Sequence, residues 1–192
     1  LILLSTLVNG LLGRSFIELL PAVSGLLLMG GASELAWLTA AAGTGAVLGG
    51  LLMSRQAAHV MGLYRLILVA LLGATLLLAT LNWLDALISL AVVVGLITFT
   101  TTIAGTGCQA LTQLLIDPNY HGRVMSLWSM TMMASPALGA ATNGALAEWA
   151  GFVTTFAVAS ALGVLAVLAL YARRRVVSDF APEAIATTSD SR

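Results

Sequence analysis

The chain has 192 residues, of which 59% are hydrophobic and 8% are charged, whereas a soluble domain carries roughly 25% charged residues. This composition excludes a water-soluble fold for most of the chain. The formal net charge is zero and every basic residue is an arginine, so no basic surface for nucleic acid is expected. The single cysteine, Cys108, excludes an intrachain disulfide and a cysteine-rich metal site.

We therefore predict an all-α, polytopic membrane protein. A helix that crosses a bilayer needs about 20 apolar residues, which leaves room for about six spans. We expect one six-helix bundle over residues 1–175 and a disordered cytoplasmic tail over residues 176–192. The start, Leu-Ile-Leu-Leu without a methionine, favours a segment of a longer protein. The spans are expected at about residues 3–29, 35–54, 65–84, 86–108, 124–147 and 152–172.

The first predicted span contains Arg14, Glu18 and Asn9, three polar residues in an apolar run. Side chains four residues apart share a helix face, so Arg14 and Glu18 are expected to meet and to neutralise each other. Charges at membrane depth are costly, and the pair should face protein or a water-filled cavity. The pair either lines a substrate or proton pathway or is structural, close enough to the interface to reach water, and both interpretations stay open.

The second and fifth predicted spans are rich in small residues. A Gly-x-x-x-Gly spacing lets two helix backbones approach closely, and a proline inside a helix favours a kink. If the six spans are two inverted repeats of three, these two spans are equivalent, which is typical of transporters. The predicted helix-packing residues are Gly43, Gly45, Gly49, Gly50, Pro136, Gly139 and Gly144.

The charges next to the predicted spans are sorted by side. Arg55, Arg65, Arg123 and the cluster 173–175 fall on one side, whereas Glu34, Asp85 and Glu148 fall on the other. Cytoplasmic loops carry an excess of arginine and lysine. We therefore place the three single arginines in cytoplasmic loops and both chain ends in the cytoplasm. The expected location is the plasma membrane, as a multi-pass protein of the bacterial inner membrane.

Four tryptophans are expected at the membrane interfaces, where an indole ring is well solvated. Trp37, Trp83 and Trp149 lie near the predicted outer interface, and Trp128 lies near the cytoplasmic start of the fifth span. None of them requires a ligand to explain it.

Catalytic and metal-binding patterns are not found in the sequence. His59 and His121 fall in predicted loops and have no second ligand at helical spacing. An intramembrane serine protease would need a Gly-x-Ser-Gly nucleophile and a histidine inside the membrane. We therefore expect no enzyme, no metal and no cofactor.

Several segments resemble a known family. Residues 50–55 (Gly-Leu-Leu-Met-Ser-Arg) followed by 62–65 (Gly-Leu-Tyr-Arg) resemble the loop motif in the second half of the major facilitator superfamily. Residues 18–22 (Glu-Leu-Leu-Pro-Ala), 43–50 and 121–127 are similar to its siderophore- and macrolide-exporter branch.

This resemblance aligns the chain with the last six of twelve helices and implies a missing amino-terminal half. It also implies a secondary transporter, an efflux antiporter that exports a small hydrophobic or siderophore-like molecule in exchange for protons by alternating access. The expected partners are the lipid bilayer, the substrate, protons and the other half. The alternative is a half-size membrane protein that does not transport and acts as a structural or oligomeric partner.

Overall fold

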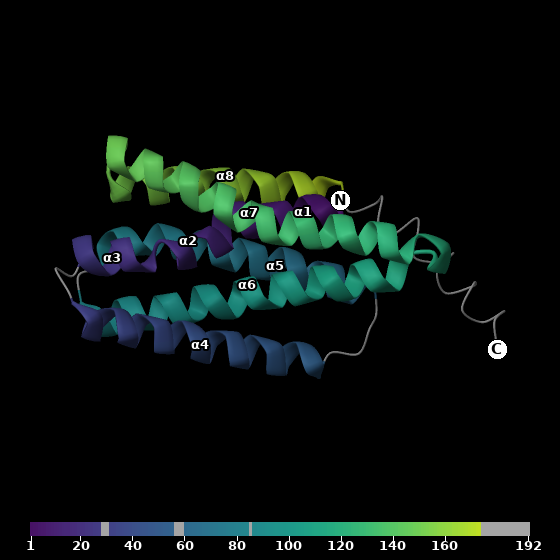
Figure 1. The fold of residues 1–192 in the computed structure, drawn as a ribbon, viewed down its shortest axis with the longest axis horizontal. Helices are drawn as coiled ribbons and strands as arrows, with labels where there is room; N and C mark the ends of the chain where they lie inside the picture. Colours follow the sequence, from purple (N-terminus) through teal and green to yellow (C-terminus); the bar gives the residue numbers. More distant parts are fainter. Residues whose placement is uncertain (28–30, 56–59, 85, 174–192) are drawn as a thin grey trace.

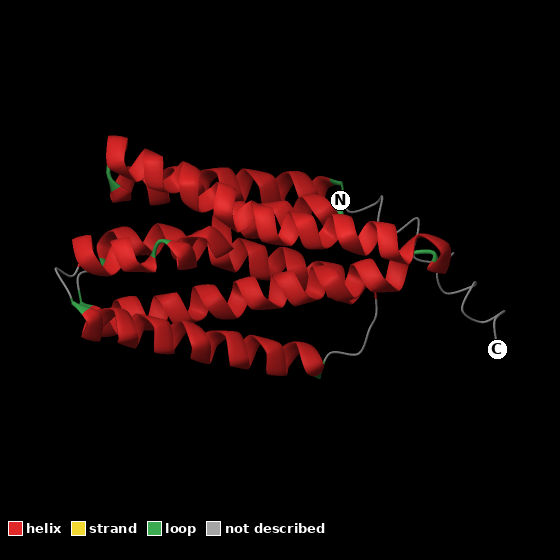
Figure 2. Cartoon of the chain, viewed as in Figure 1, coloured by secondary structure: helices red, strands yellow, loops and turns green. Residues whose placement is uncertain are grey.

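The computed structural model describes residues 1–27, 31–55, 60–84 and 86–173, and every regular element within these ranges is a helix (Figure 2). The all-α prediction is therefore confirmed for this part of the chain. The predicted tail, residues 176–192, lies outside the described residues, as do Gln56, His59 and Asp85.

The first predicted span is divided into four short segments, which together are called the first helix below. They are α1 (Ile2–Val8), the π-helical turn η1 (Asn9–Arg14), α2 (Ser15–Glu18) and α3 (Leu20–Leu27). The remaining elements are α4 (Ala32–Ser54), α5 (Val60–Thr80), the 3₁₀ turn η2 (Leu81–Trp83), α6 (Leu87–Leu115), η3 (Pro118–Tyr120), α7 (His121–Ala150) and α8 (Phe152–Ala172).

The helices lie along the long axis of the molecule (Figure 1). Helix α4 packs on α6, α5 packs on α6 and α8, and α7 packs on the first helix and α8. The start of α1 and the end of α8 lie at the same end of the bundle (Figure 1).

Four helices of the described part are long and apolar enough to cross a membrane: α4, α5 continued by η2, α6 and α8. The protein is therefore a membrane protein. Six continuous spans are not confirmed, because the first predicted span is interrupted and α7 is not among these four. Serine, threonine, asparagine and histidine along α7 lower its hydropathy. The first helix is interrupted at Leu19, two residues before Pro21, whose nitrogen has no hydrogen to donate.

The helix ends follow the local sequence. The side chain of Glu34 accepts a hydrogen bond of 2.7 Å from the backbone N–H of Gly31, one half of a capping arrangement that starts α4. Gly151 separates α7 from α8 with a φ of 83°, a conformation that glycine adopts without strain. Helix α6 has 29 residues, about 43 Å at 1.5 Å per residue, so it extends beyond a hydrocarbon core of about 30 Å.

Two apolar clusters form the core, one in each half of the bundle. The first is built around Tyr64, Ile67 and Leu111, and the Tyr64 hydroxyl donates a hydrogen bond of 3.2 Å to the carbonyl of Leu170. The second cluster includes Phe16 and Phe156, whose rings meet edge to face at 5.6 Å. Burial of these side chains against one another fixes the positions of α5, α6 and α8.

Candidate functional site

A layer of buried polar and small residues separates the two apolar clusters. On the first helix the clusters include Val8 and Phe16, and the residues between them include the buried Asn9 and Ser15. The same order recurs on three other helices, where buried hydroxyl groups lie between residues of the two clusters. The residues that define this polar layer are Asn9, Ser15, Thr75, Thr98, Thr101 and Ser160.

The π-helical turn of the first helix lies in this layer and frees a backbone carbonyl. The N–H of Ser15 bonds to the carbonyl of Gly10 instead of that of Leu11. The carbonyl of Leu11 accepts hydrogen bonds from side chains: 2.6 Å from Ser15 Oγ and 3.4 Å from Asn143 Nδ2. Asn143 Nδ2 also donates to Ser15 Oγ at 3.1 Å. Helix α7 is therefore attached to the first helix at the turn where the regular hydrogen-bond pattern fails.

Asn9 joins the same turn to α6. Its Nδ2 donates a hydrogen bond of 3.2 Å to the carbonyl of Thr101. Asn9 Oδ1 and Ser135 Oγ have no hydrogen-bond partner within the described residues, although each residue is 1% exposed. A buried polar atom without a hydrogen-bond partner lowers the stability of the fold. Packing alone therefore does not explain why these two residues lie in the layer.

Glycines bring the helices into close contact at two crossings. A Cβ atom at Gly45 would collide with the carbonyl oxygen of Gly95, so α4 and α6 meet backbone to backbone. A Cβ atom at Gly139 would collide with the carbonyl oxygen of Leu11, and one at Gly10 with the side chain of Ser135. The second crossing joins α7 to the first helix. Helices α4 and α7 thus make corresponding contacts, as expected of the second and fifth helices in two inverted repeats.

The predicted helix-packing residues differ in their surroundings. Gly49 faces the carbonyl of Phe99, 2.8 Å from an added Cβ, and the buried Pro136 lies next to Gly10. An added Cβ would meet nothing within 4 Å at Gly43 or Gly50, and at Gly144 it would meet a Leu19 methyl group at 3.8 Å. The structure therefore gives a close contact to Gly45, Gly49, Gly139 and Pro136, and leaves Gly43 and Gly50 against open space.

Arg14 and Glu18 do not form the expected pair. Both side chains are exposed, and among the described residues no ion pair joins them. Neither side chain is enclosed by the bundle, so packing within the described residues does not hold the two together. Asn9 is buried against α6, so the structure does not bring the three predicted pathway residues together. Arg14 and Glu18 instead lie on one exposed stripe of the first helix with Pro21 and Gly25.

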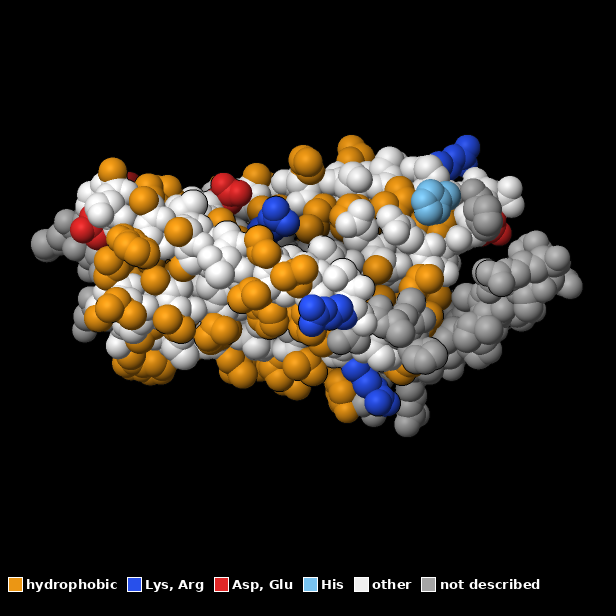
Figure 3. Space-filling view, turned by 90° about the horizontal axis from the view of Figure 1, so that it is seen from below, with side chains coloured by type: hydrophobic (Ala, Val, Ile, Leu, Met, Phe, Trp, Pro, Cys, Tyr) orange, Lys and Arg blue, Asp and Glu red, His pale blue; other side chains and the backbone are white. Residues whose placement is uncertain are grey.

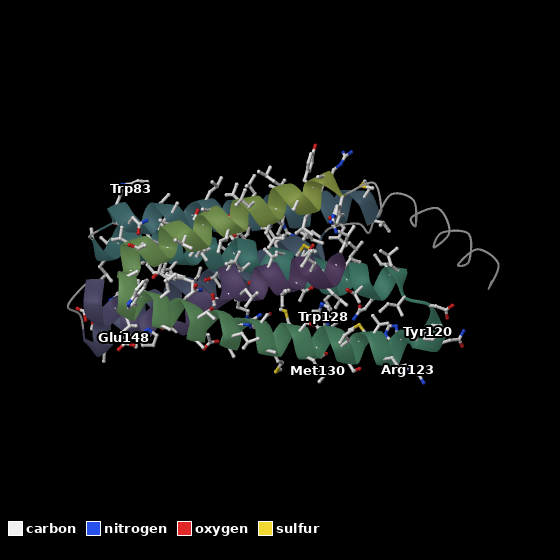
Figure 4. All side chains as sticks on the ribbon, turned by 90° about the horizontal axis from the view of Figure 1, so that it is seen from above. Trp83, Tyr120, Arg123, Trp128, Met130 and Glu148 are labelled. Atoms are coloured by element: carbon white, nitrogen blue, oxygen red, sulfur yellow. The ribbon has the colours of Figure 1, made fainter. Side chains whose placement is uncertain are left out.

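The three arginines predicted for cytoplasmic loops are all exposed, but Arg65 lies within α5 and Arg123 within α7, whereas Arg55 follows the end of α4. Arg123 lies with Tyr120 at one end of the bundle, whereas Trp83 and Glu148 lie at the other (Figure 4). In the space-filling view the basic side chains lie toward one half of the visible face and hydrophobic side chains cover much of the remainder (Figure 3). His121 is exposed at the start of α7.

The expectation that Trp128 anchors the chain at a membrane interface is wrong. Trp37, Trp83 and Trp149 are exposed, but Trp128 is 7% exposed, and its Nε1 has no partner within the described residues. The reason is its position on α7: Trp128, Ser135 and Gly139 are seven and four residues apart and therefore share the face that packs inward.

Sequence reasoning did not assign a role to Ser15, Thr101 or Asn143. A hydroxyl or amide group inside an apolar run indicates a buried hydrogen bond, but the sequence does not show which residue is the hydrogen-bond partner. Asn143 lies 132 residues from Leu11, so this hydrogen bond depends on the tertiary structure.

Comparison with known proteins gives one match. The sequence model of the family described as the Major Facilitator Superfamily matches residues 2–189, nearly the whole chain. No curated protein and no solved structure matches.

Proposed function

Because this chain belongs to the Major Facilitator Superfamily, we propose that it is a secondary active transporter that exports a small hydrophobic or siderophore-like molecule by alternating access. In this proposal the chain is one six-helix bundle, in which the first helix and α7 cross the membrane together with the four long apolar helices. It works with a second bundle of six helices, and the substrate site lies between the two bundles near mid-depth.

The observation that carries the proposal is the broken first helix. A π-helical turn and a break at Leu19 interrupt it inside an otherwise apolar segment. Irregular backbone at membrane depth is tolerated where it is buried in protein or lines a cavity, and transporters build their binding sites from such helices. The exposed Arg14 is the last residue of the π-helical turn, and the exposed Glu18 is the last residue of α2, directly before Leu19.

We assign the substrate pathway to the exposed stripe that contains Arg14 and Glu18. Asn9 lies on the buried side of the same helix and holds it against α6 through its hydrogen bond to the carbonyl of Thr101. A charged side chain in the hydrocarbon is costly, so this stripe must face water or the second bundle instead of lipid. Glu18 then supplies a titratable group for proton coupling, and Arg14 supplies a fixed positive charge four residues away. The cytoplasmic side is the end that carries Arg55 and Arg123.

Substitution of Glu18 tests this assignment. In proteoliposomes containing the full-length chain, Glu18→Gln should reduce proton-driven transport nearly to the rate of empty vesicles, because glutamine keeps the shape but cannot release a proton. Since Glu18 is exposed and has no ion-pair partner among the described residues, the free energy of unfolding should change by no more than about 0.5 kcal/mol. Transport of a fluorescent hydrophobic probe and thermal unfolding in detergent measure the two effects.

Glu148→Gln is the matched control, because Glu148 is also an exposed glutamate on a helix of the bundle but lies near its end, beside Trp149. This control should keep normal transport. Normal transport in Glu18→Gln would contradict the pathway assignment. A strong loss of stability in Glu18→Gln would instead show that the residue is structural.

A further inference from the structure

An apolar groove of about 920 Å³ lies between α4 and α6. Its walls include Trp37 and Leu48 from α4, and Val92, Leu96 and Phe99 from α6. The lining comes wholly from described residues of these two helices and contains no charged side chain.

The close crossing of α4 and α6 creates this groove. At the crossing Gly45 and Gly95 touch through their backbones, and neither residue has a side chain to fill the space beside the contact. Ala41 and Ala91 extend this floor of small residues, and the large side chains on either side form the walls. The glycine contact that sets the distance between the two helices therefore also produces the groove between their large side chains.

The groove opens away from the first helix and its charged stripe. On α6, Thr101 and Gly105 face the first helix, where they contact Gly13 and Asn9. Val92 precedes Thr101, and Leu96 precedes Gly105, by nine residues each, or two and a half helical turns, so they lie on the opposite face. The stripe with Arg14 and Glu18 requires water or protein. The uncharged groove therefore lies on the face of α6 that is turned away from this stripe.

The length of the groove matches one leaflet of a bilayer. Trp37 and Leu48 are eleven residues apart, about 16 Å along α4, and the hydrocarbon of one leaflet is about 15 Å thick. On α6 the lining begins at Leu87, directly after the turn that carries the exposed Trp83, and ends at Phe99. The groove therefore runs from the interface at the Trp83 end to the middle of the membrane.

We propose that this groove is a lipid-binding site, which holds one acyl chain of a phospholipid from the leaflet on the Trp83 side. An acyl chain is uncharged, like the lining, and it enters from the interface and ends at mid-depth, as the groove does. Trp37, 65% exposed at the mouth of the groove, lies where an indole can contact the glycerol and headgroup region. The site does not depend on the proposed substrate or on proton coupling.

A matched pair of threonines on α4 tests the site. Thr44 lines the groove, whereas Thr39 does not. Both are exposed, and each hydroxyl donates a hydrogen bond of 2.8 Å to the carbonyl four residues earlier. Thr44→Phe places a ring in the groove, and Thr39→Phe places the same ring on another face of the same helix.

The full-length chain is purified in mild detergent, titrated with palmitoyl-oleoyl phosphatidylethanolamine and studied by native mass spectrometry. The wild-type protein should retain one lipid at low lipid concentration. Thr44→Phe should lower the apparent affinity about tenfold, and Thr39→Phe should leave it unchanged.

Three results would overturn the proposal: no lipid retained by the wild-type protein, equal retention in the two variants, or a change in oligomeric mass caused by Thr44→Phe. The last result would show that a protein segment fills the groove. Circular dichroism of both variants ensures that a loss of lipid is not a loss of fold.

Discussion

The backbone carbonyl of Leu11 accepts hydrogen bonds from two side chains because the π-helical turn takes away its usual donor. One of these side chains, Asn143, belongs to α7, so a single backbone atom couples two helices. Inside a membrane such bonds contribute modestly, because a separated helix also finds partners for its polar groups. The contact can therefore form and break at a small cost.

Asn143→Ala removes both hydrogen bonds that α7 makes to this turn. We expect the free energy of unfolding to fall by about 1 kcal/mol, a typical value for a hydrogen bond between helices in a membrane. Unfolding at increasing concentrations of a denaturing detergent, followed by circular dichroism, measures the loss of stability.

Thr142→Ala is the control, because Thr142 is exposed and its hydroxyl bonds within α7, to the carbonyls of Leu138 and Gly139. It should change the stability by less than Asn143→Ala does. Equal losses of stability in the two variants would show that the contact with Leu11 and Ser15 stabilises the protein no more than a hydrogen bond within α7.

Glycines set the distances between elements at two crossings. At Gly45 and Gly139 the neighbouring atom is a backbone carbonyl oxygen, which cannot move aside as the end of a side chain could. The contact of α4 with α6 and the contact of α7 with the first helix therefore depend on the absence of one Cβ atom each. This dependence explains why α4, with few buried large side chains, still packs closely along α6.

Gly45→Ala should destabilise the protein by about 1–3 kcal/mol, the usual cost of overpacking a close contact. The added methyl group would force α4 away from the Gly95 carbonyl. Folded yield after extraction and the melting temperature in detergent measure the effect. Gly43→Ala, two residues away with nothing within 4 Å of the new atom, should be neutral. Equal melting temperatures in both variants would contradict the close crossing.

The sequence allowed the helices to be predicted but not the interruptions within them. Long apolar runs gave α8 with the bounds that the structure has, 152–172, and gave the end of α4 at Ser54. The π-helical turn could not be predicted, because it depends on Asn9 reaching Thr101 and on Asn143 reaching Leu11. Helix α7 also extends beyond the predicted 124–147, to His121 and Ala150, because a helix can continue through charged residues such as Arg123 and Glu148 that end an apolar run.

The candidate site was predictable only in part, for a related reason. Helical spacing places Arg14 and Glu18 four residues apart, but it does not show that both side chains are exposed and that no ion pair joins them within the described residues. Spacing also does not show which face of α7 packs inward, so the sequence predicts an interfacial Trp128, whereas the structure buries it. Facing directions depend on contacts between helices that are distant in sequence.

For the whole molecule, the distribution of charge along the bundle predicts its orientation in the membrane. Arg123 and Tyr120 lie at one end, and Trp83 and Glu148 lie at the other (Figure 4). Since the cytoplasmic segments of membrane proteins carry an excess of arginine and lysine, the end with Arg123 should be cytoplasmic. Asn119 and Glu148 are exposed and lie close to these two ends, so they are suitable positions for labelling.

A single cysteine at position 148, introduced as Glu148→Cys with Cys108→Ala, should react with a membrane-impermeant maleimide added to intact cells. A cysteine introduced as Asn119→Cys in the same background should react only after the cells are opened. Cys108 is buried, so its replacement by alanine removes background labelling with little change at the surface. Both variants carry the label on exposed residues at the ends of the bundle, and a difference in labelling therefore reports the side of the membrane and not local burial. Labelling of position 119 in intact cells, with protection of position 148, would reverse the orientation, because the maleimide reaches only the outer side of the membrane. Transport direction in the proposed function would then have to be reassigned, since the same six-helix bundle would present its arginine-rich end to the outside.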